Sequence, residues 1–397
     1  MENQKMKKRI HILFVIVISI LISIVISFIP KIRMYSHRYK CKQELYKVKT
    51  TIDTNDVTFK ALELFESDLE NNEIFIAGES HGSVKSIDMN LYLLKYFVER
   101  GNVKYILYED GYASAQYLNI YLDTGDESIL EDLFYKSRGT MSYTMENYNF
   151  LKGVYEYNAT LEEEKKLRFI GIDKENPLVA IKYIRSLLPI AEPTDDITEE
   201  FISVIKELSK STYIDKSKEA IQLLSDGEKE IEKYLGEHYF DLTFTLKNLA
   251  VSEDQLNREE LLINNFIELY EYLPKGKFFG QFGGAHTNLN PNTKSLAAYL
   301  QNNYEKTKDK VISINYEYNN SHSYIPQGLN ADSKLSGNID QGFFPDDKST
   351  VLLKLNYEDS IYYEKDIYLN DNNPQIKYFQ YIILISDSQA ANKYYMN

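Results

Sequence analysis

The stretch Glu73-Ile-Phe-Ile-Ala-Gly-Glu-Ser-His-Gly82 decides the fold. Its first half, 73–77, is a short apolar run rich in β-forming residues, which predicts a buried strand. Its second half, Gly78-Glu-Ser-His-Gly82, follows the strand directly and places two ionisable side chains between glycines. Strands buried on both faces belong to parallel sheets that helices cover, so this stretch favours an α/β fold.

The order of strand and amphipathic helix repeats along the chain. Apolar residues recur at helical spacing in 87–98 and again in 113–122. Further strands are predicted at 105–108, 167–171, 277–282, 311–315 and 381–385. This alternation predicts an α/β fold with a mostly parallel sheet and helices on both faces.

Two long segments interrupt this pattern within the predicted domain, 51–397. Residues 177–275 are rich in Glu, Lys, Leu and Ile at helical spacing, which predicts a helical insertion. Residues 319–349 collect Asn, Ser, Gly, Pro and Asp, which is typical of a long loop. The chain has neither a P-loop nor a Rossmann glycine motif, so nucleotide chemistry lacks its usual support.

Residues 10–30 predict one transmembrane signal anchor. Every residue from Ile12 to Ile29 is apolar or serine, and as a helix this run crosses roughly 27 Å. A basic tail, 1–9, precedes the anchor, a basic linker, 31–50, follows it, and no small-residue cleavage pattern separates them. We expect a single-pass protein of the cell membrane. Both flanks are basic, and we favour an extracytoplasmic catalytic domain.

The distribution of charge argues against a nucleic-acid partner. The net charge is −14, although the first fifty residues hold eleven Lys and Arg against two Glu. An acidic body repels phosphates, and the basic residues lie beside the apolar segment. The single cysteine, Cys41, excludes an internal disulfide and a cysteine-based zinc cluster. We therefore expect a small-molecule substrate, and a membrane contact through the N-terminal helix.

Unusual polar residues follow four of the predicted strands. In chain order they are Glu79 and His81, Glu109 and Asp110, Asp173, and His286. The carboxyl ends of strands in an open α/β sheet form the ligand crevice, so we expect these side chains to share one cleft. For a single carboxylate such as Asp173, a helix cap is an equally good interpretation.

His81 is the strongest candidate for a general base. The flanking glycines let the backbone turn tightly, and the start of a helix disfavours an imidazolium, which predicts a neutral ring. Arg258 and Asn265 share one face of a predicted helix that leads into the strand before His286. We expect both to line the cleft, although an arginine on a helix is commonly solvated.

The ordered set of motifs resembles the erythromycin esterase family. In chain order the set is Gly78–Gly82, Glu109, Ala113–Gly125, Phe169–Asp173, Arg258–Asn265 and Gly283–His286. The likeness runs from about residue 62 to residue 386. The resemblance implies a hydrolytic site in which His81 is the general base and Glu109 supports it. It also implies that the helix beginning at Arg258 lines the site and that His286 supplies a second histidine.

The chain departs from the family at each motif. Its first motif is one residue shorter, Glu259 replaces an aspartate, Leu262 replaces a methionine, and Gly283-Gly284 replace a histidine and an asparagine. The resemblance therefore implies the fold and a hydrolytic site rather than a macrolide substrate. The shortened first motif is also similar to the wider superfamily with ChaN-type haem-uptake lipoproteins and Tiki-type metalloproteases.

The first functional hypothesis is hydrolysis of an ester or lactone without a cofactor. In it His81 deprotonates water, Glu79 or Glu109 fixes the imidazole tautomer, and His286 and Arg258 stabilise the oxyanion. Asp173 and Asn265 are expected to contact the substrate.

Two alternatives use the same cleft. Two histidines and several carboxylates suit a divalent metal, which would make the chain a metal-dependent hydrolase or protease, although no compact metal motif is present. The third hypothesis is a membrane-tethered protein that binds a haem-like or other small ligand without turnover.

Overall fold

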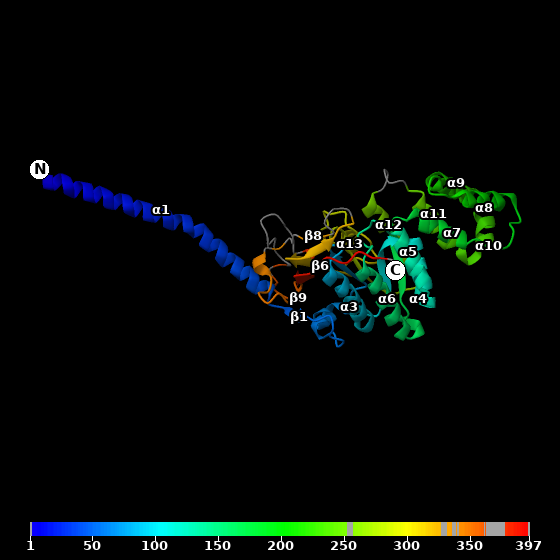
Figure 1. Ribbon diagram of the computed structural model, residues 1–397, viewed down its shortest axis with the longest axis horizontal. Helices are drawn as coiled ribbons and strands as arrows, with labels where there is room; N and C mark the ends of the chain where they lie inside the picture. Colours follow the sequence, from blue (N-terminus) through cyan, green and yellow to red (C-terminus); the bar gives the residue numbers. More distant parts are fainter. Residues whose placement is uncertain are drawn as a thin grey trace.

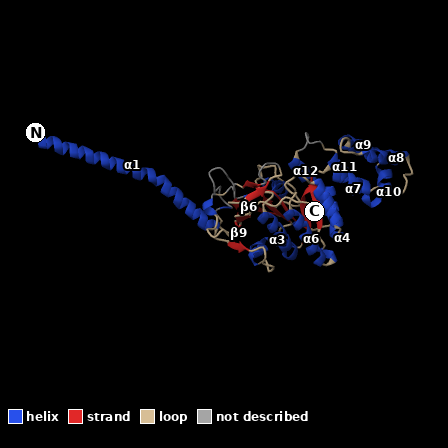
Figure 2. Cartoon of the chain, in the orientation of Figure 1, coloured by secondary structure: helices blue, strands red, loops and turns tan. Residues whose placement is uncertain are grey.

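The computed structural model describes residues 2–251, 257–326, 332–335, 339, 341–360, 362 and 378–395. Within the first helix, the side chains of residues 2–5, 9, 23–27, 30–35, 37 and 38 lie outside this description. A long N-terminal helix extends from one side of the body (Figure 1). Figure 2 shows strands in the middle of the body with helices around them.

Within the described residues, eight strands form the central sheet in the order β1-β9-β10-β6-β2-β5-β3-β4. Neighbours from β10 to β4 pair in parallel, whereas β9 and β1 continue the sheet as antiparallel strands. The bounds are β1 Lys49–Ile52, β2 Ile74–Glu79, β3 Val103–Gly111, β4 Arg168–Asp173, β5 Lys277–Gly283, β6 Val311–Asn319, β9 Thr350–Lys354 and β10 Tyr381–Ser386. The predicted α/β fold with a mostly parallel sheet is confirmed.

Helices cover both faces of this sheet. Phe75 and Ala77 of β2 pack into one hydrophobic cluster, and their neighbours Ile74 and Ile76 pack into another. Successive side chains of a strand point to opposite faces, so the two clusters lie on opposite sides. Besides the N-terminal helix and the short α2 Glu66–Leu69, the described α-helices outside the insertion are α3 Val84–Gly101, α4 Tyr112–Thr124, α5 Glu127–Lys136, α6 Met145–Thr160 and α13 Leu296–Asn302. The first cluster includes residues of α3 to α6, and the second includes residues of α13.

The chain between β4 and β5 is helical, as the sequence pattern of 177–275 predicts. Its described helices are α7 Pro177–Ser186, α8 Asp196–Glu207, α9 Tyr213–Asp226, α10 Glu228–Leu235, α11 Tyr239–Leu249 and α12 Arg258–Tyr272. Asn176, Asp195 and Asn257 accept hydrogen bonds from backbone N–H groups at the starts of α7, α8 and α12. These side-chain caps explain where the three helices begin.

The first helix, α1, runs from Glu2 to Leu45 and contains the predicted anchor, 10–30. Among the described residues, no helix has the length and apolar character needed to cross a bilayer. The side chains of residues 23–27 and 30 within the predicted anchor lie outside the described part of the chain. The transmembrane anchor is therefore not confirmed and stays a prediction.

Some pieces of sheet were not predicted. β1 and the end of α1 occupy the segment predicted as a basic linker, 31–50, and β9 begins directly after the predicted loop, 319–349. A further antiparallel pair, β7 His322–Tyr324 and β8 Asp332–Lys334, lies within that loop, part of which is outside the described residues. All four strands are short, and β1, β7 and β8 lack the continuous apolar run of a strand buried on both faces.

Candidate active site

Ionisable side chains meet at the carboxyl ends of the neighbouring strands β2, β5, β3 and β4. Glu79 ends β2, Asp173 ends β4, and Glu109 lies near the end of β3. β5 ends at Gly283 and leads directly into a short 3₁₀ helix, Gly284–His286. Parallel strands bring their carboxyl ends to one edge of the sheet, which is why residues far apart in the sequence meet here.

The ring of His81 lies in the turn between β2 and α3, and Glu79 fixes it. Nδ1 of His81 is 2.9 Å from Oε1 of Glu79, whereas Nε2 is 3.8 Å from Oε2 of Glu109, beyond hydrogen-bonding distance. The turn needs Gly82, whose φ of +77° lies in the left-handed region. A β-carbon at Gly283 would lie 3.2 Å from Nε2, so this glycine leaves room for the ring.

The carboxylate of Glu109 is the centre of the cluster. Its Oε1 accepts a hydrogen bond from Nη2 of Arg258 at 2.7 Å and lies 3.4 Å from Nε2 of His286. Its Oε2 accepts from the backbone N–H of Gly283 at 2.8 Å. Both histidines therefore lie beside one carboxylate, which is mostly shielded from solvent.

Asp173 holds the guanidinium of Arg258 at the mouth of the site. Nε of Arg258 lies 3.1 Å from both carboxylate oxygens of Asp173, and Nη2 contacts Oδ2 as well. This forked contact fixes the plane of the guanidinium, and the same Nη2 then reaches Glu109. Asp173, predicted to contact substrate, is thus the partner that orients Arg258.

Both ring nitrogens of His286 contact carboxylates. Nδ1 hydrogen-bonds Oε1 of Glu259, and Nε2 faces Glu109. The second oxygen of Glu259 accepts from the backbone N–H of Leu296 at 2.8 Å, at the start of α13. Because the side chain of His286 is only 9% exposed, its geometry suits holding Glu109 better than touching a ligand.

Asn265 lies apart from this cluster. Its Nδ2 donates to the backbone carbonyl of Ile172 at 2.9 Å, and the residue is buried where α12 packs against β4. The structure therefore brings His81, Glu79, Glu109, His286, Arg258 and Asp173 together. Asn265, predicted to contact substrate, instead joins α12 to β4.

The neighbouring carboxylates make both imidazoles more basic. Burial lowers the pKa of His81, but the hydrogen bond to Glu79 and the charges of Glu79 and Glu109 outweigh it and raise this pKa to about 9. Burial also lowers the pKa of His286, while the hydrogen bonds to Glu109 and Glu259 raise it to about 9. The prediction of a neutral His81 ring at the helix start is wrong, because two carboxylates outweigh the helix terminus.

Glu109 and Arg258 are both held in their charged forms, because the pKa of Glu109 is lowered and that of Arg258 is raised. Burial raises the pKa of Glu109, but the hydrogen bond from His286, the charge of His81 and the N–H of Gly283 lower it to about 2. Hydrogen bonds to Asp173 keep the pKa of Arg258 above its usual range. At neutral pH, the cluster therefore contains an anion at Glu109 between three cations.

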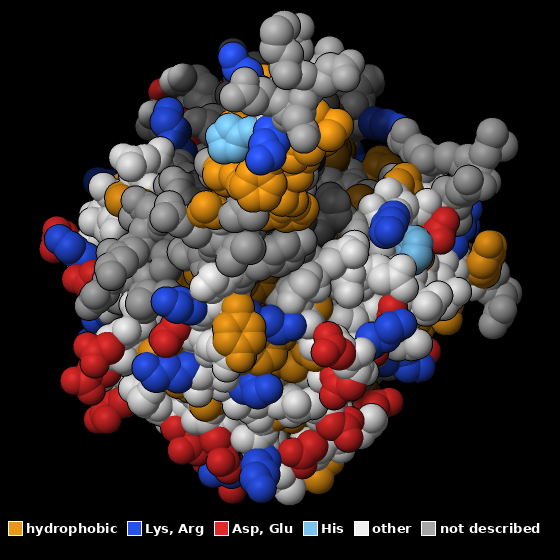
Figure 3. All heavy atoms as spheres, turned by 90° about the vertical axis from the view of Figure 1, so that its left-hand side faces the viewer, with side chains coloured by type: hydrophobic (Ala, Val, Ile, Leu, Met, Phe, Trp, Pro, Cys, Tyr) orange, Lys and Arg blue, Asp and Glu red, His pale blue; other side chains and the backbone are white. Residues whose placement is uncertain are grey.

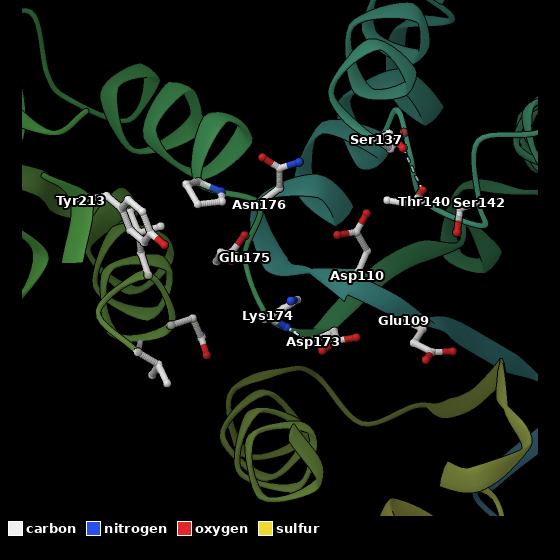
Figure 4. Close-up of a pocket in the computed structure, with 14 residues that line it drawn as sticks. Glu109, Asp110, Ser137, Thr140, Ser142, Asp173, Lys174, Glu175, Asn176 and Tyr213 are labelled. Carbon is white, nitrogen blue, oxygen red and sulfur yellow. Dashed lines mark hydrogen bonds between the residues drawn. The ribbon is translucent and has the colours of Figure 1, made fainter. Parts of the chain in front are cut away.

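Two pockets open on this cluster. One of about 230 Å³ is lined by Glu79, His81, Asn90, Tyr108, Met141, Asn147, Phe150, Arg258 and Gln281, among others. The second, of about 380 Å³, is lined by Ser137, Thr140, Asp173, Lys174, Glu175, Asn176, Tyr213 and Asn248, among others (Figure 4). Glu109, Asp110 and Ser142 line both, so the pockets meet beyond the end of β3.

The residues of the cluster do not fit a metal. Among the described residues, no group of three or more His, Cys, Asp or Glu side chains is arranged to hold a metal ion. The guanidinium of Arg258 lies between Asp173 and Glu109, so a cation of the protein already balances the carboxylates that a metal would need. The divalent metal considered from the sequence therefore finds no suitable donor set in this part of the chain.

Sequence reasoning missed several residues that line the pockets, above all Glu175, and it placed Asp110 in the cleft without giving it a role. A regular strand turns only one of Glu109 and Asp110 toward the cleft, since successive side chains face opposite sides. Glu175 follows the end of β4 by two residues, and its burial could not be read from the loop composition. Asp110 had one usable signal, its place beside Glu109 at the end of a strand.

Comparison with known proteins supports the fold. No family model and no curated protein matches the chain. Solved structures do: a protein from Bacillus cereus matches with a TM-score of 0.64 at 18% identity, covering 90% of this chain and 99% of that one. A succinoglycan biosynthesis protein matches with a TM-score of 0.61 at 16% identity and the same coverage.

An erythromycin esterase, solved as a mutant in an open conformation, matches with a TM-score of 0.61 at 15% identity. The match covers 87% of this chain and 99% of the esterase. The resemblance seen in the motifs is thus confirmed at the level of the fold. At this identity the likeness shows the fold alone, because one α/β fold supports many activities.

Proposed function

We propose that the chain is a hydrolase that splits an ester or lactone bond of a small molecule with water. The observation that carries this proposal is the environment of His81. Glu79 holds its Nδ1, while the ring lines a pocket that also contains the guanidinium of Arg258. A held imidazole opposite a fixed cation is the arrangement that attack of water on a carbonyl requires.

In the proposed reaction, the neutral ring of His81 removes a proton from water through Nε2. The water oxygen attacks the carbonyl carbon, Glu79 stabilises the imidazolium that forms, and Arg258 stabilises the negative charge on the carbonyl oxygen. Glu109, Asp173, His286 and Glu259 act indirectly, because their contacts with one another and with Arg258 fix the position of the guanidinium.

The two oxygens of Glu79 differ in their surroundings. Oε1 of Glu79 contacts His81, but Oε2 is buried and has no hydrogen-bond partner among the described residues. Buried carboxylate oxygens normally have a partner, which in many sites is a water molecule or a ligand. Because Oε2 has almost no accessible surface, Glu79 acts on the pocket through Oε1 and the ring of His81.

His81→Ala tests the proposal directly. Loss of a general base typically slows a reaction about 10²–10⁴-fold, so we expect this variant to lose kcat by about that factor. The measurement is hydrolysis of a panel of 4-nitrophenyl esters and lactones by the full chain. His238→Ala is the matched control, because His238 lies in a 3₁₀ helix of the helical insertion, away from the cleft.

Two outcomes would contradict this function. Full activity of a folded His81→Ala protein would show that another group activates water. A wild-type protein that binds members of the panel and releases them unchanged would favour the alternative of ligand binding without turnover. Thermal unfolding of each variant confirms that it is folded.

We also propose that α1 attaches the chain to a membrane. Eleven large apolar side chains between Ile10 and Ile22 are exposed. Figure 3 looks at the molecule from the side on which α1 projects, and hydrophobic side chains gather in the upper part of this view. Exposed apolar surface of this kind marks contact with a protein or a membrane, and the basic residues Lys7 and Lys8 beside it favour an anionic lipid surface.

A further inference from the structure

Asp110 lies where the two pockets of the cleft meet. It lines the 230 Å³ pocket with His81 and Arg258, and it lines the 380 Å³ pocket with Asp173 and Glu175. Figure 4 shows its side chain between those of Glu109 and Glu175 at the end of β3 and β4. A ligand that fills both pockets must pass this carboxyl group.

A bulge in β3 places Asp110 there. Tyr108 pairs with Gly171 and Gly111 pairs with Asp173, so β3 contains one more residue than β4 over this interval. In a regular strand, neighbouring side chains face opposite sides of the sheet, yet Glu109 and Asp110 both line both pockets. Bulges often re-aim a side chain beside an active site, and this one gives the cleft a second carboxyl group.

The surroundings of Asp110 raise its pKa. Burial raises its pKa to about 6, the backbone N–H of Gly111 acts against this, and the charges of Asp173 and Glu109 add to the increase. The adjacent Glu175 has its pKa raised to about 8, mainly by burial. The larger pocket thus has carboxyl groups that hold protons in the pH range where Glu109 is fully ionised.

We propose that Asp110 is the general acid of the reaction and that the 380 Å³ pocket holds the alcohol part of the ester. This inference rests on the proposed hydrolysis. The ester carbonyl lies in the smaller pocket, where His81 and Arg258 act, and the leaving oxygen lies beside Asp110. The hydroxyl, amide and carboxyl groups that line the larger pocket suit an alcohol with further hydroxyl groups.

The proton balance of this step is complete. His81 takes one proton from water, and the water oxygen forms a bond to the carbonyl carbon. When the intermediate collapses, the bond between this carbon and the leaving oxygen breaks, and the leaving oxygen takes the proton of Asp110. The imidazolium of His81 returns its proton through solvent to Asp110, and the acid product ionises, so one ester and one water give one carboxylate, one alcohol and one proton.

A series of esters of one acid tests this role. Protonation matters little for a 4-nitrophenolate leaving group and strongly for an alkoxide. We therefore expect kcat/KM of the wild type to change little across aryl and alkyl esters. The Asp110→Asn substitution should lower kcat/KM for the alkyl esters by about 100-fold or more, which is a typical contribution of a general acid. It should lower kcat/KM for the 4-nitrophenyl ester by less than about 10-fold. Asp226→Asn is the matched control, because Asp226 is an exposed aspartate at the end of α9 that lines neither pocket, and it should leave kcat/KM nearly unchanged for every ester.

The outcomes separate this inference from the proposed function. If the wild type hydrolyses none of the esters, both fail. If it hydrolyses them but Asp110→Asn slows aryl and alkyl esters equally, Asp110 only shapes the pocket, and the inference fails alone. If Asp110→Asn does not fold, the wild-type series still decides, because a steep fall of kcat/KM from aryl to alkyl esters would show that no acid protonates the leaving group.

Discussion

Glu79 and Glu109 raise the pKa of His81 to about 9. The neutral ring, which is the base that the proposed reaction needs, is therefore scarce at neutral pH. At pH 7 about one ring in a hundred is neutral. The same carboxylates orient the ring and stabilise the imidazolium during the reaction. They thus also limit the fraction of protein molecules whose His81 ring is neutral and can start the reaction. The positions of these two glutamates set a compromise between positioning and basicity.

For a 4-nitrophenyl ester, we therefore expect kcat/KM to rise with pH through neutrality and to level off near pH 9. This substrate reports on the base alone, since its leaving group needs no acid. Glu79→Gln removes one negative charge from His81 and should move the rise to lower pH. The measurement is kcat/KM of the wild type and of Glu79→Gln between pH 6 and pH 10. A profile that is flat or falls over pH 7–9 would contradict His81 as the base.

The residues of the cleft differ in how far the sequence predicts them. Glu79, His81, Glu109, Asp173 and His286 follow predicted strands, and the geometry of a parallel sheet is enough to bring such residues together. The electrostatics were not predictable, because the pKa of His81 depends on which carboxylates lie within a few ångströms of it. That information exists only in the folded arrangement.

At the scale of elements, α12 positions the site through contacts on two sides. Arg258, at its first turn, reaches Asp173 at the end of β4, and Asn265, two turns later, donates to the carbonyl of Ile172. The side chain of Asn265 thus joins α12 to β4 through a hydrogen bond. Its helical spacing from Arg258 predicted a shared face correctly, but not that the strand backbone occupies that face.

Asn265→Leu tests this assignment. The substitution leaves the buried carbonyl of Ile172 without a partner, which should lower the free energy of unfolding by about 1–3 kcal/mol. KM for any ester should change little, because the amide does not face the pockets. Asn264→Leu on the exposed side of the same helix is the control and should leave stability nearly unchanged. A raised KM with unchanged stability would instead make Asn265 a substrate contact.

The strands of the sheet also differ in how well the sequence predicts them. The parallel strands β2 and β10 have apolar runs that neither face interrupts, which is why the sequence predicts them. β1 has the sequence Lys49-Thr-Thr-Ile52 and lies at the antiparallel edge, so it needs few apolar residues. The bulge at Glu109 and Asp110 depends on the register of β3 against β4 and has no local sequence signal.

At the scale of the whole molecule, the folded body begins before the predicted domain boundary at residue 51. Cys41 and Leu45, at the end of α1, are buried in a cluster with Phe343, Leu353 and Tyr362. Tyr362 donates a hydrogen bond to the carbonyl of Cys41. A chain that started at Thr51 would lose these contacts and half of β1. The end of α1 therefore belongs to the core, whereas the large apolar side chains between Ile10 and Ile22 are exposed.

Two deletions separate these parts of α1. Removal of residues 2–35 takes away the exposed apolar side chains and keeps Cys41 and Leu45, so the protein should leave the membrane fraction and keep its melting temperature. Removal of residues 2–46 also empties the space of two buried side chains, and this protein should melt at a lower temperature. The measurements are sedimentation with membranes at high salt and thermal unfolding. If the full chain stays in the supernatant, α1 does not attach it to a membrane, and its apolar surface must instead meet another protein.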